Sequence, residues 1–118
     1  MNSKINKPTQ QAQNLTDALR ARGLRVRTEV WDGHKTIDIE ITDAKVDIEV
    51  DGLHHLTSPD QILSDLSRGF YSGKAGFHTI HIPNEMVDKH LYAIADALAD
   101  ASRILTEKIK VNLYSAHL

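Results

Sequence analysis

The fold of this chain is decided by residues 36–51, which read TIDIEITDAKVDIEVD. Its two hexapeptides, TIDIEI and VDIEVD, alternate apolar and polar side chains with a period of two, which is typical of strands with one buried face. The tetrapeptide TDAK between them predicts a tight turn. The stretch therefore predicts an antiparallel β-hairpin.

A two-residue loop at the centre of this turn fixes the register of the hairpin. Counting from it places Glu40 opposite Asp47 and Asp38 opposite Glu49, with Asp51 on the same face. Like charges that oppose each other directly destabilise a sheet. The hairpin therefore requires cations on this face, either basic side chains or a bound metal ion.

The elements outside the hairpin follow from capping residues and periodicity. Thr9 is a helix N-cap and Gly23 a stop signal, and Ser58-Pro59-Asp60-Gln61 is a capping-box start. The pattern predicts helices over 10–22, 59–72 and from 84 onward, and strands over 25–31, 36–41, 46–51 and 77–82. This order predicts an α/β sandwich, with a mixed sheet and helices on both faces. We expect an N-terminal arm at 1–8, one domain at 9–108 and a loose or partner-docked tail at 109–118.

The strand that precedes the hairpin adds positive charge to the same face. A tight turn at Asp32-Gly33 would bring Arg27 opposite Asp38 and Arg25 opposite Glu40. These two arginines face six acids, so four negative charges stay unbalanced. The sequence leaves two interpretations open, a solvated salt-bridged face and a divalent metal site. The acids are Glu29, Asp38, Glu40, Asp47, Glu49 and Asp51.

The amino-acid composition limits the kinds of functional site that the chain can form. The 118 residues are 41% hydrophobic and 25% charged, as in ordinary globular domains, and the formal net charge is −2, which gives no overall basic signature of a nucleic-acid binder. Without cysteine there is no disulfide framework and no thiolate metal site, so a cytoplasmic setting is expected and any metal ligands are oxygen or imidazole. No apolar run is long enough to span a membrane.

Asp38 and Glu49 are the acidic pair best suited to a metal ion. Mg²⁺ takes oxygen ligands, usually one or two carboxylates together with water and phosphate, and adjacent strands hold two carboxylates rigidly. The Val50 carbonyl is a candidate third oxygen, and Asp51 is placed to hold a second ion or to orient water.

The stretch Ile48-Glu49-Val50-Asp51-Gly52-Leu53-His54-His55, with Asp38 about ten residues upstream and Asp65 and Arg68 downstream, resembles a known family. It is similar to the small restriction-endonuclease-like domains related to very short patch repair endonucleases. The likeness spans roughly residues 9 to 100. It implies a PD-(D/E)xK nuclease core and a DNA endonuclease that uses Mg²⁺, with Mn²⁺ as a substitute.

The resemblance also implies roles for single residues. Asp38 and Glu49 would be metal ligands, and Asp51 stands where many members of the superfamily have lysine and joins them at the metal. His55 is the motif histidine near the scissile phosphate, and Arg68 would hold phosphate or brace the acids. The catalytic set implied is therefore Asp38, Glu49, Asp51 and His55.

Two departures from the family pattern favour an alternative. The first helix of such domains often presents a glutamate, whereas this chain has Gln11 and Gln13, and the last strand often has an arginine where His81 stands. The alternative is a catalytically inactive relative that serves as a nucleic-acid-binding or protein-interaction module.

Further residues have candidate roles in binding. His54 lies in the motif loop, and Arg27 belongs to a basic cluster with Arg20, Arg22 and Arg25 that is suited to DNA phosphates, although such a cluster is more often a solvated surface. The final helix is amphipathic, and its apolar stripe is explained most simply by core packing. An excess of that stripe toward Leu113 points instead to a homodimer.

Overall fold

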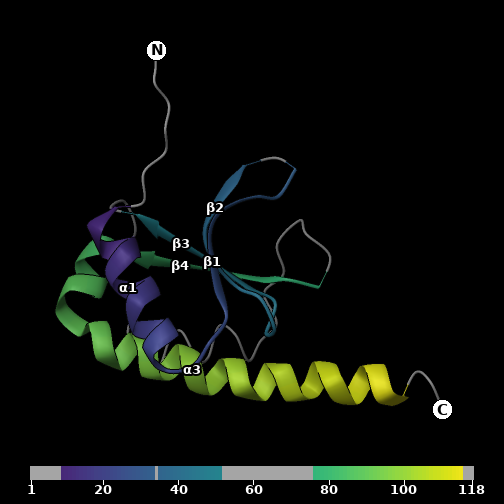
Figure 1. Cartoon of the computed structure of the whole chain (residues 1–118). Coiled ribbons are helices and arrows are strands. Elements are labelled where there is room, and N and C mark those ends of the chain that lie inside the picture. Colours follow the sequence, from purple (N-terminus) through teal and green to yellow (C-terminus); the bar gives the residue numbers. More distant parts are fainter. Residues whose placement is uncertain (1–8, 34, 52–75, 116–118) are drawn as a thin grey trace.

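The computed structural model describes residues 9–33, 35–51 and 76–115. Their strands form one four-stranded sheet in the order β1-β2-β3-β4. The strands are β1 (Val26–Trp31), β2 (Thr36–Ile41), β3 (Val46–Asp51) and β4 (His78–Pro83), and the helices are α1 (Gln10–Ala21) and α3 (Asn84–Ser115). β1–β2 and β2–β3 are antiparallel and β3–β4 is parallel, so the predicted mixed sheet and α/β class are confirmed (Figure 1).

The first helix forms where its capping residues predict it. The Thr9 hydroxyl accepts a hydrogen bond from the Ala12 amide at 3.1 Å, which satisfies one of the donors left open at a helix start. The helix ends before Gly23, whose φ of +85° is readily adopted only by a residue without a side chain. Leu15 and Leu19, one turn apart, are fully buried and fix the face that α1 presents to the core.

The β2–β3 hairpin has the predicted register. Glu40 pairs with Asp47, and the Lys45 amide donates to the Thr42 carbonyl at 3.3 Å to close the turn. Lys45 has a φ of +56°, so this turn uses a left-handed residue that is not glycine.

The predicted register between β1 and β2 is wrong by two residues. Arg27 pairs with Glu40, not with Asp38, and Trp31 pairs with Thr36. The loop is longer than the dipeptide Asp32-Gly33 suggests, because the Asp32 carboxylate accepts from the Lys35 amide at 2.8 Å and the Asp32 amide donates to the Lys35 carbonyl at 3.0 Å. A slip of two residues keeps every side chain on its predicted face.

The same slip of two residues also removes the predicted pairing of Arg25 with Glu40. Arg25 was expected opposite Glu40, but its guanidinium lies 3.5 Å from the Asp43 carboxylate at the β2–β3 turn. Both side chains are largely exposed, so this ion pair contributes little to stability.

The last helix is longer than the sequence pattern indicates. It begins at Asn84, as predicted, has a break in its helical geometry at His90, and continues to Ser115. The tail expected at 109–118 therefore starts inside a helix.

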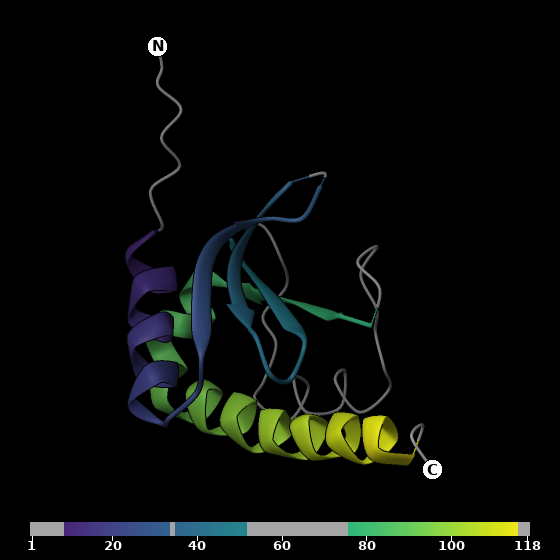
Figure 2. The same cartoon turned by 45° about the vertical axis from the view of Figure 1, so that its right-hand side comes forward.

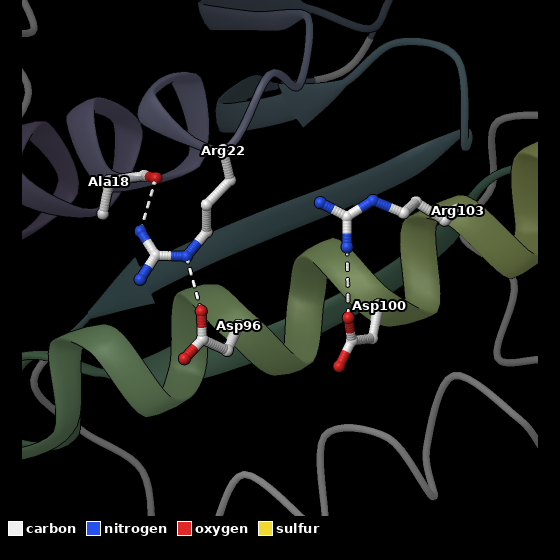
Figure 3. A network of polar contacts seen from close by, with 5 residues as sticks. All are labelled: Ala18, Arg22, Asp96, Asp100 and Arg103. Atoms are coloured by element: carbon white, nitrogen blue, oxygen red, sulfur yellow. Dashed lines mark hydrogen bonds and ion pairs between the residues drawn. The ribbon is translucent and has the colours of Figure 1, made fainter.

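The core lies on one side of the sheet. Apolar side chains of the four strands form a cluster with residues of α1 and α3. The two helices pack against each other on that side (Figures 1 and 2). The helix predicted over 59–72, which would cover the opposite face, lies outside the described residues. In the described part of the chain, no helix is both long and apolar enough to cross a membrane.

Candidate functional site

The sheet face opposite α1 and α3 carries its polar side chains in transverse rows. The first row runs across all four strands and contains Arg27, Glu40, Asp47 and Thr79, each paired with the next. Because side chains of one face recur at every second residue, a second row lies two positions further along the strands. The second row, called here the carboxylate row, consists of Glu29, Asp38, Glu49 and His81.

The first row buries two opposed acids. Glu40 is 1% exposed and Asp47 is 0% exposed. The Arg27 guanidinium reaches in from the exposed rim and lies 3.3 Å from a Glu40 carboxylate oxygen. Because opposed like charges in a buried setting are costly, Arg27 compensates charge at this point of the face.

Asp38, in the carboxylate row, fixes the geometry between β2 and β3. The paired residues of the two strands end at Ile39 and Ile48, just before Asp38. From there the Asp38 carboxylate accepts a hydrogen bond from the Val50 amide at 2.8 Å. This hydrogen bond ties the Asp38 carboxylate to the backbone of β3, at the residue next to Glu49.

Glu49 lies in an electrostatic setting that disfavours its ionised form. Burial raises the pKa of Glu49, and the neighbouring charges of Asp38 and, more weakly, Asp47 raise the same pKa further. The Lys35 ammonium, 3.6 Å from Oε2 of Glu49, partly offsets the rise. The charge of Asp38 acts on Glu49 from the neighbouring strand, so the two carboxylates belong to one electrostatic cluster.

Glu29 completes the acidic part of the row. Burial, and then the charge of Asp38, raises the pKa of Glu29. Its φ of +52° is a left-handed conformation that is uncommon for a residue with a side chain and costs conformational energy. Such outliers persist only where the surrounding structure over-determines them.

Sequence reasoning gave no site role to Glu29 or Lys35. Glu29 was counted among the acids of the face, but period-two alternation carries no sign of a left-handed residue. Lys35 falls in the loop whose length was underestimated. Asp32 stands at the start of the loop, and aspartate side chains often accept hydrogen bonds from backbone amides two or three residues further on. Asp32 was therefore a sequence signal for the longer loop.

The other predicted site residues are only partly placed. Asp51 ends β3 and pairs with Pro83, but its side chain is outside the described part of the structure. His54, His55 and Arg68 also lie outside the described residues, so their predicted roles are untested.

Two histidines of β4 point to opposite faces, as expected. His78 is buried, and burial lowers its pKa, whereas His81 is exposed and pairs in register with Glu49. The two side chains therefore do not form a zinc pair.

The glutamines that depart from the family pattern make contacts on the helical side. The Gln11 amide donates to the Asp88 carboxylate of α3 at 3.2 Å, and the Gln13 amide donates to Asp17 one turn along α1 at 3.0 Å. Because α1 packs on the opposite side of the sheet, neither amide replaces a carboxylate of the carboxylate row.

The fit of this site to a metal ion is partial. Within residues 9–33, 35–51 and 76–115, no three His, Asp or Glu side chains converge closely enough to hold an ion. Asp38 and Glu49 supply two carboxylates from adjacent strands, which suits a hard cation that fills its remaining positions with water and phosphate oxygens. Carboxylate oxygens are ligands that suit Mg²⁺ or Mn²⁺, and the chain has no thiolate that would favour zinc.

A solved structure has a similar fold. No protein-family model and no curated protein matches the chain. The catalytic domain of the homing endonuclease I-Bth0305I superposes with a TM-score of 0.55 at 13% sequence identity, over 82% of this chain and 97% of that domain. At this identity the likeness establishes a nuclease-like α/β fold, and the relation to very short patch repair endonucleases remains a prediction.

Proposed function

We propose that this chain is a metal-dependent DNA endonuclease-like protein that hydrolyses phosphodiester bonds. The observation that carries the proposal is that Asp38 binds the β3 backbone beside Glu49, where its charge raises the pKa of Glu49. A divalent cation that binds between the two groups would relieve this repulsion and so stabilise the folded state. The similarity to a homing endonuclease catalytic domain supports the same conclusion at the level of the fold.

Asp38 and Glu49 would hold the ion, with Asp51 as the third carboxylate. When bound, a divalent ion lowers the pKa of water and neutralises charge that develops on a phosphodiester. DNA is the expected substrate. His55 and Arg68 are proposed to contact its phosphate on the basis of the family resemblance, and His54 because it lies in the same loop of the sequence motif.

Two cations of the described face are proposed to assist in binding the phosphate of the substrate. Lys35 lies beside Glu49 and adds positive charge where a scissile phosphate would approach. Arg27 keeps most of its side chain exposed while it pairs with Glu40, so its remaining donors are accessible to a DNA phosphate at the rim.

Metal binding tests this proposal before any cleavage assay. Thermal unfolding of the full chain with increasing Mn²⁺ should show a rising midpoint, because a ligand that binds only the folded state stabilises it by RT ln(1 + [L]/Kd). Asp38→Asn and Glu49→Gln should each abolish the rise. Asp43→Asn, which removes an equal charge from the β2–β3 turn, is the matched control and should retain it.

Cleavage is then measured on supercoiled and linear DNA. The wild-type protein and Asp43→Asn should cut with Mg²⁺ or Mn²⁺, and Glu49→Gln should not. Equal cutting by wild type and Glu49→Gln would remove Glu49 from the mechanism.

One observation favours a second candidate, a catalytically silent binding module. The three acids Asp38, Glu40 and Glu49 are all engaged within the chain, by the Val50 amide, the Arg27 guanidinium and the Lys35 ammonium. A silent module would bind DNA with neither a Mn²⁺-dependent rise in the unfolding midpoint nor cleavage.

A further inference from the structure

The C-terminal part of α3, from Arg103 on, differs from the rest of the helix in its surroundings. From Ile94 to Ser102 most side chains are buried, whereas from Arg103 to Leu113 none is. Figures 1 and 2 show this part of the helix, coloured yellow, continuing beyond the region where α1 packs on it. Leu105 still packs against the core, but this part of the helix gains less from tertiary packing than Ile94 to Ser102 does.

The exposed segment nevertheless carries large apolar side chains. Ile104 is 57% exposed, Val111 is 59% exposed and Leu113 is 60% exposed. Ile104 and Val111 are two turns apart on one side of the helix. They line a shallow depression of about 580 Å³ together with Arg103, Glu107, Lys108 and Asn112. Clustered exposed apolar residues with a polar border are typical of protein interaction sites.

The order of residues on this side is self-complementary. Ile104, Glu107, Lys108 and Val111, here called the α3 patch, read apolar, acidic, basic, apolar with spacings of three, one and three. When two copies pair antiparallel about a twofold axis between Glu107 and Lys108, each Glu107 faces Lys108 of the second copy. The same axis places each Ile104 against Val111 of the second copy.

We propose that the α3 patch is the docking surface for a second copy of this chain, in an antiparallel, twofold-symmetric helix pair. A twofold interface uses the same patch on both subunits, which the α3 patch satisfies. The antiparallel arrangement also opposes the two helix dipoles favourably. A parallel arrangement would set Glu107 against Glu107 and Lys108 against Lys108, so charge selects the direction.

The present partner of Glu107 does not prevent this pairing. Glu107 lies 3.7 Å from Lys110 of its own helix, and both side chains are 70% exposed. A long, exposed ion pair of this kind contributes little and exchanges readily.

The size of the patch sets the strength of the dimer. Residues 103–112 span about 15 Å of helix, which is too short for the roughly 1,600 Å² of a standard interface. We therefore expect a dissociable dimer, with a dissociation constant on the order of micromolar or weaker. The inference does not depend on the proposed nuclease function.

Charge exchange between the two central positions tests the pairing. Sedimentation of the full chain, from about 1 µM to about 1 mM, should show dimer at the upper end. Glu107→Lys and Lys108→Glu should each weaken association by roughly tenfold or more, since the symmetry places every change in two contacts. The double variant Glu107→Lys/Lys108→Glu should restore association, because both ion pairs re-form with their signs exchanged.

Lys89→Glu is the matched control, since it reverses a charge on an exposed position of the same helix that pairs with Glu85. It should dimerise like the wild type. Thermal unfolding of each variant checks that the fold is retained, as expected for exposed sites. A monomer at every concentration would overturn the proposal, and so would dimers that tolerate both single changes or that the double change fails to restore.

Discussion

Ile39 and Ile48 face each other across β2 and β3 and are fully buried against the helices, while Glu40 and Asp47, the next pair along, are equally buried on the opposite face. The same two strands, in the same register, thus bury an apolar pair that stabilises the sheet and an opposed acidic pair whose burial is costly without a compensating cation such as Arg27. The apolar face supplies the free energy that holds the charged face together. Strain and repulsion persist in folded proteins only where the surrounding structure over-determines them.

The largest effect is expected on the apolar face. Ile48→Ala removes a fully buried side chain opposite Ile39 and should lower the free energy of unfolding by about 2–5 kcal/mol, through lost burial and the cavity left behind. Ile48→Val, the conservative control, should cost about 0.5–1.5 kcal/mol. Urea denaturation measures both. A loss below about 1 kcal/mol for Ile48→Ala would show that this face does not supply the stability assigned to it.

The two faces also differ in how far the sequence predicts them. The apolar face follows from alternation alone, and the pairing of Glu40 with Asp47 follows from the turn that precedes Lys45. The pairing between β1 and β2 does not follow from the sequence pattern, because the Asp32 carboxylate closes a longer loop than the dipeptide Asp32-Gly33 suggests.

That longer loop is what makes the site hard to predict. It brings Lys35 to Glu49, and it pairs Arg27 with Glu40 instead of Asp38. The left-handed backbone at Glu29 has no local sequence signal. The acids of the site are therefore predictable from the pattern, whereas the cations that balance them depend on loop geometry.

A smaller effect is expected on the charged face, with the opposite sign. Because burial and Asp38 raise the pKa of Glu29, the folded state binds the Glu29 proton more tightly than the unfolded state does. The ionised carboxylate therefore destabilises the fold at neutral pH. Glu29→Gln should raise the free energy of unfolding at pH 7, provided that the amide keeps the same backbone conformation.

The pH dependence of this gain separates charge from packing. The destabilisation by Glu29 is fully present above its folded-state pKa, and it disappears as the pH falls below the ordinary value of 4.5. The advantage of Glu29→Gln should thus shrink steadily as the pH is lowered toward about 4. Asp17→Asn, at an exposed position of α1, is the control and should show no comparable advantage at pH 7. An advantage of Glu29→Gln that is the same at pH 7 and pH 4 would assign the effect to packing rather than to the charge of the Glu29 carboxylate.

The smallest effect on stability is expected at the one described ammonium group paired with Glu49, that of Lys35. In Lys35→Met the charge is lost while an apolar stem remains, and the metal-free protein should lose up to about 1 kcal/mol, since the ion pair is partly exposed. Removal of the same cation should strengthen Mn²⁺ binding, because Lys35 and a divalent ion compete for the charge of Glu49. Lys89→Met, which breaks an exposed pair with Glu85, should change neither quantity by more than a few tenths of a kcal/mol. Calorimetric titration with Mn²⁺ gives the affinity and urea denaturation gives the stability. Weaker Mn²⁺ binding by Lys35→Met would mean that Lys35 helps to organise the carboxylates for the ion instead of competing with it.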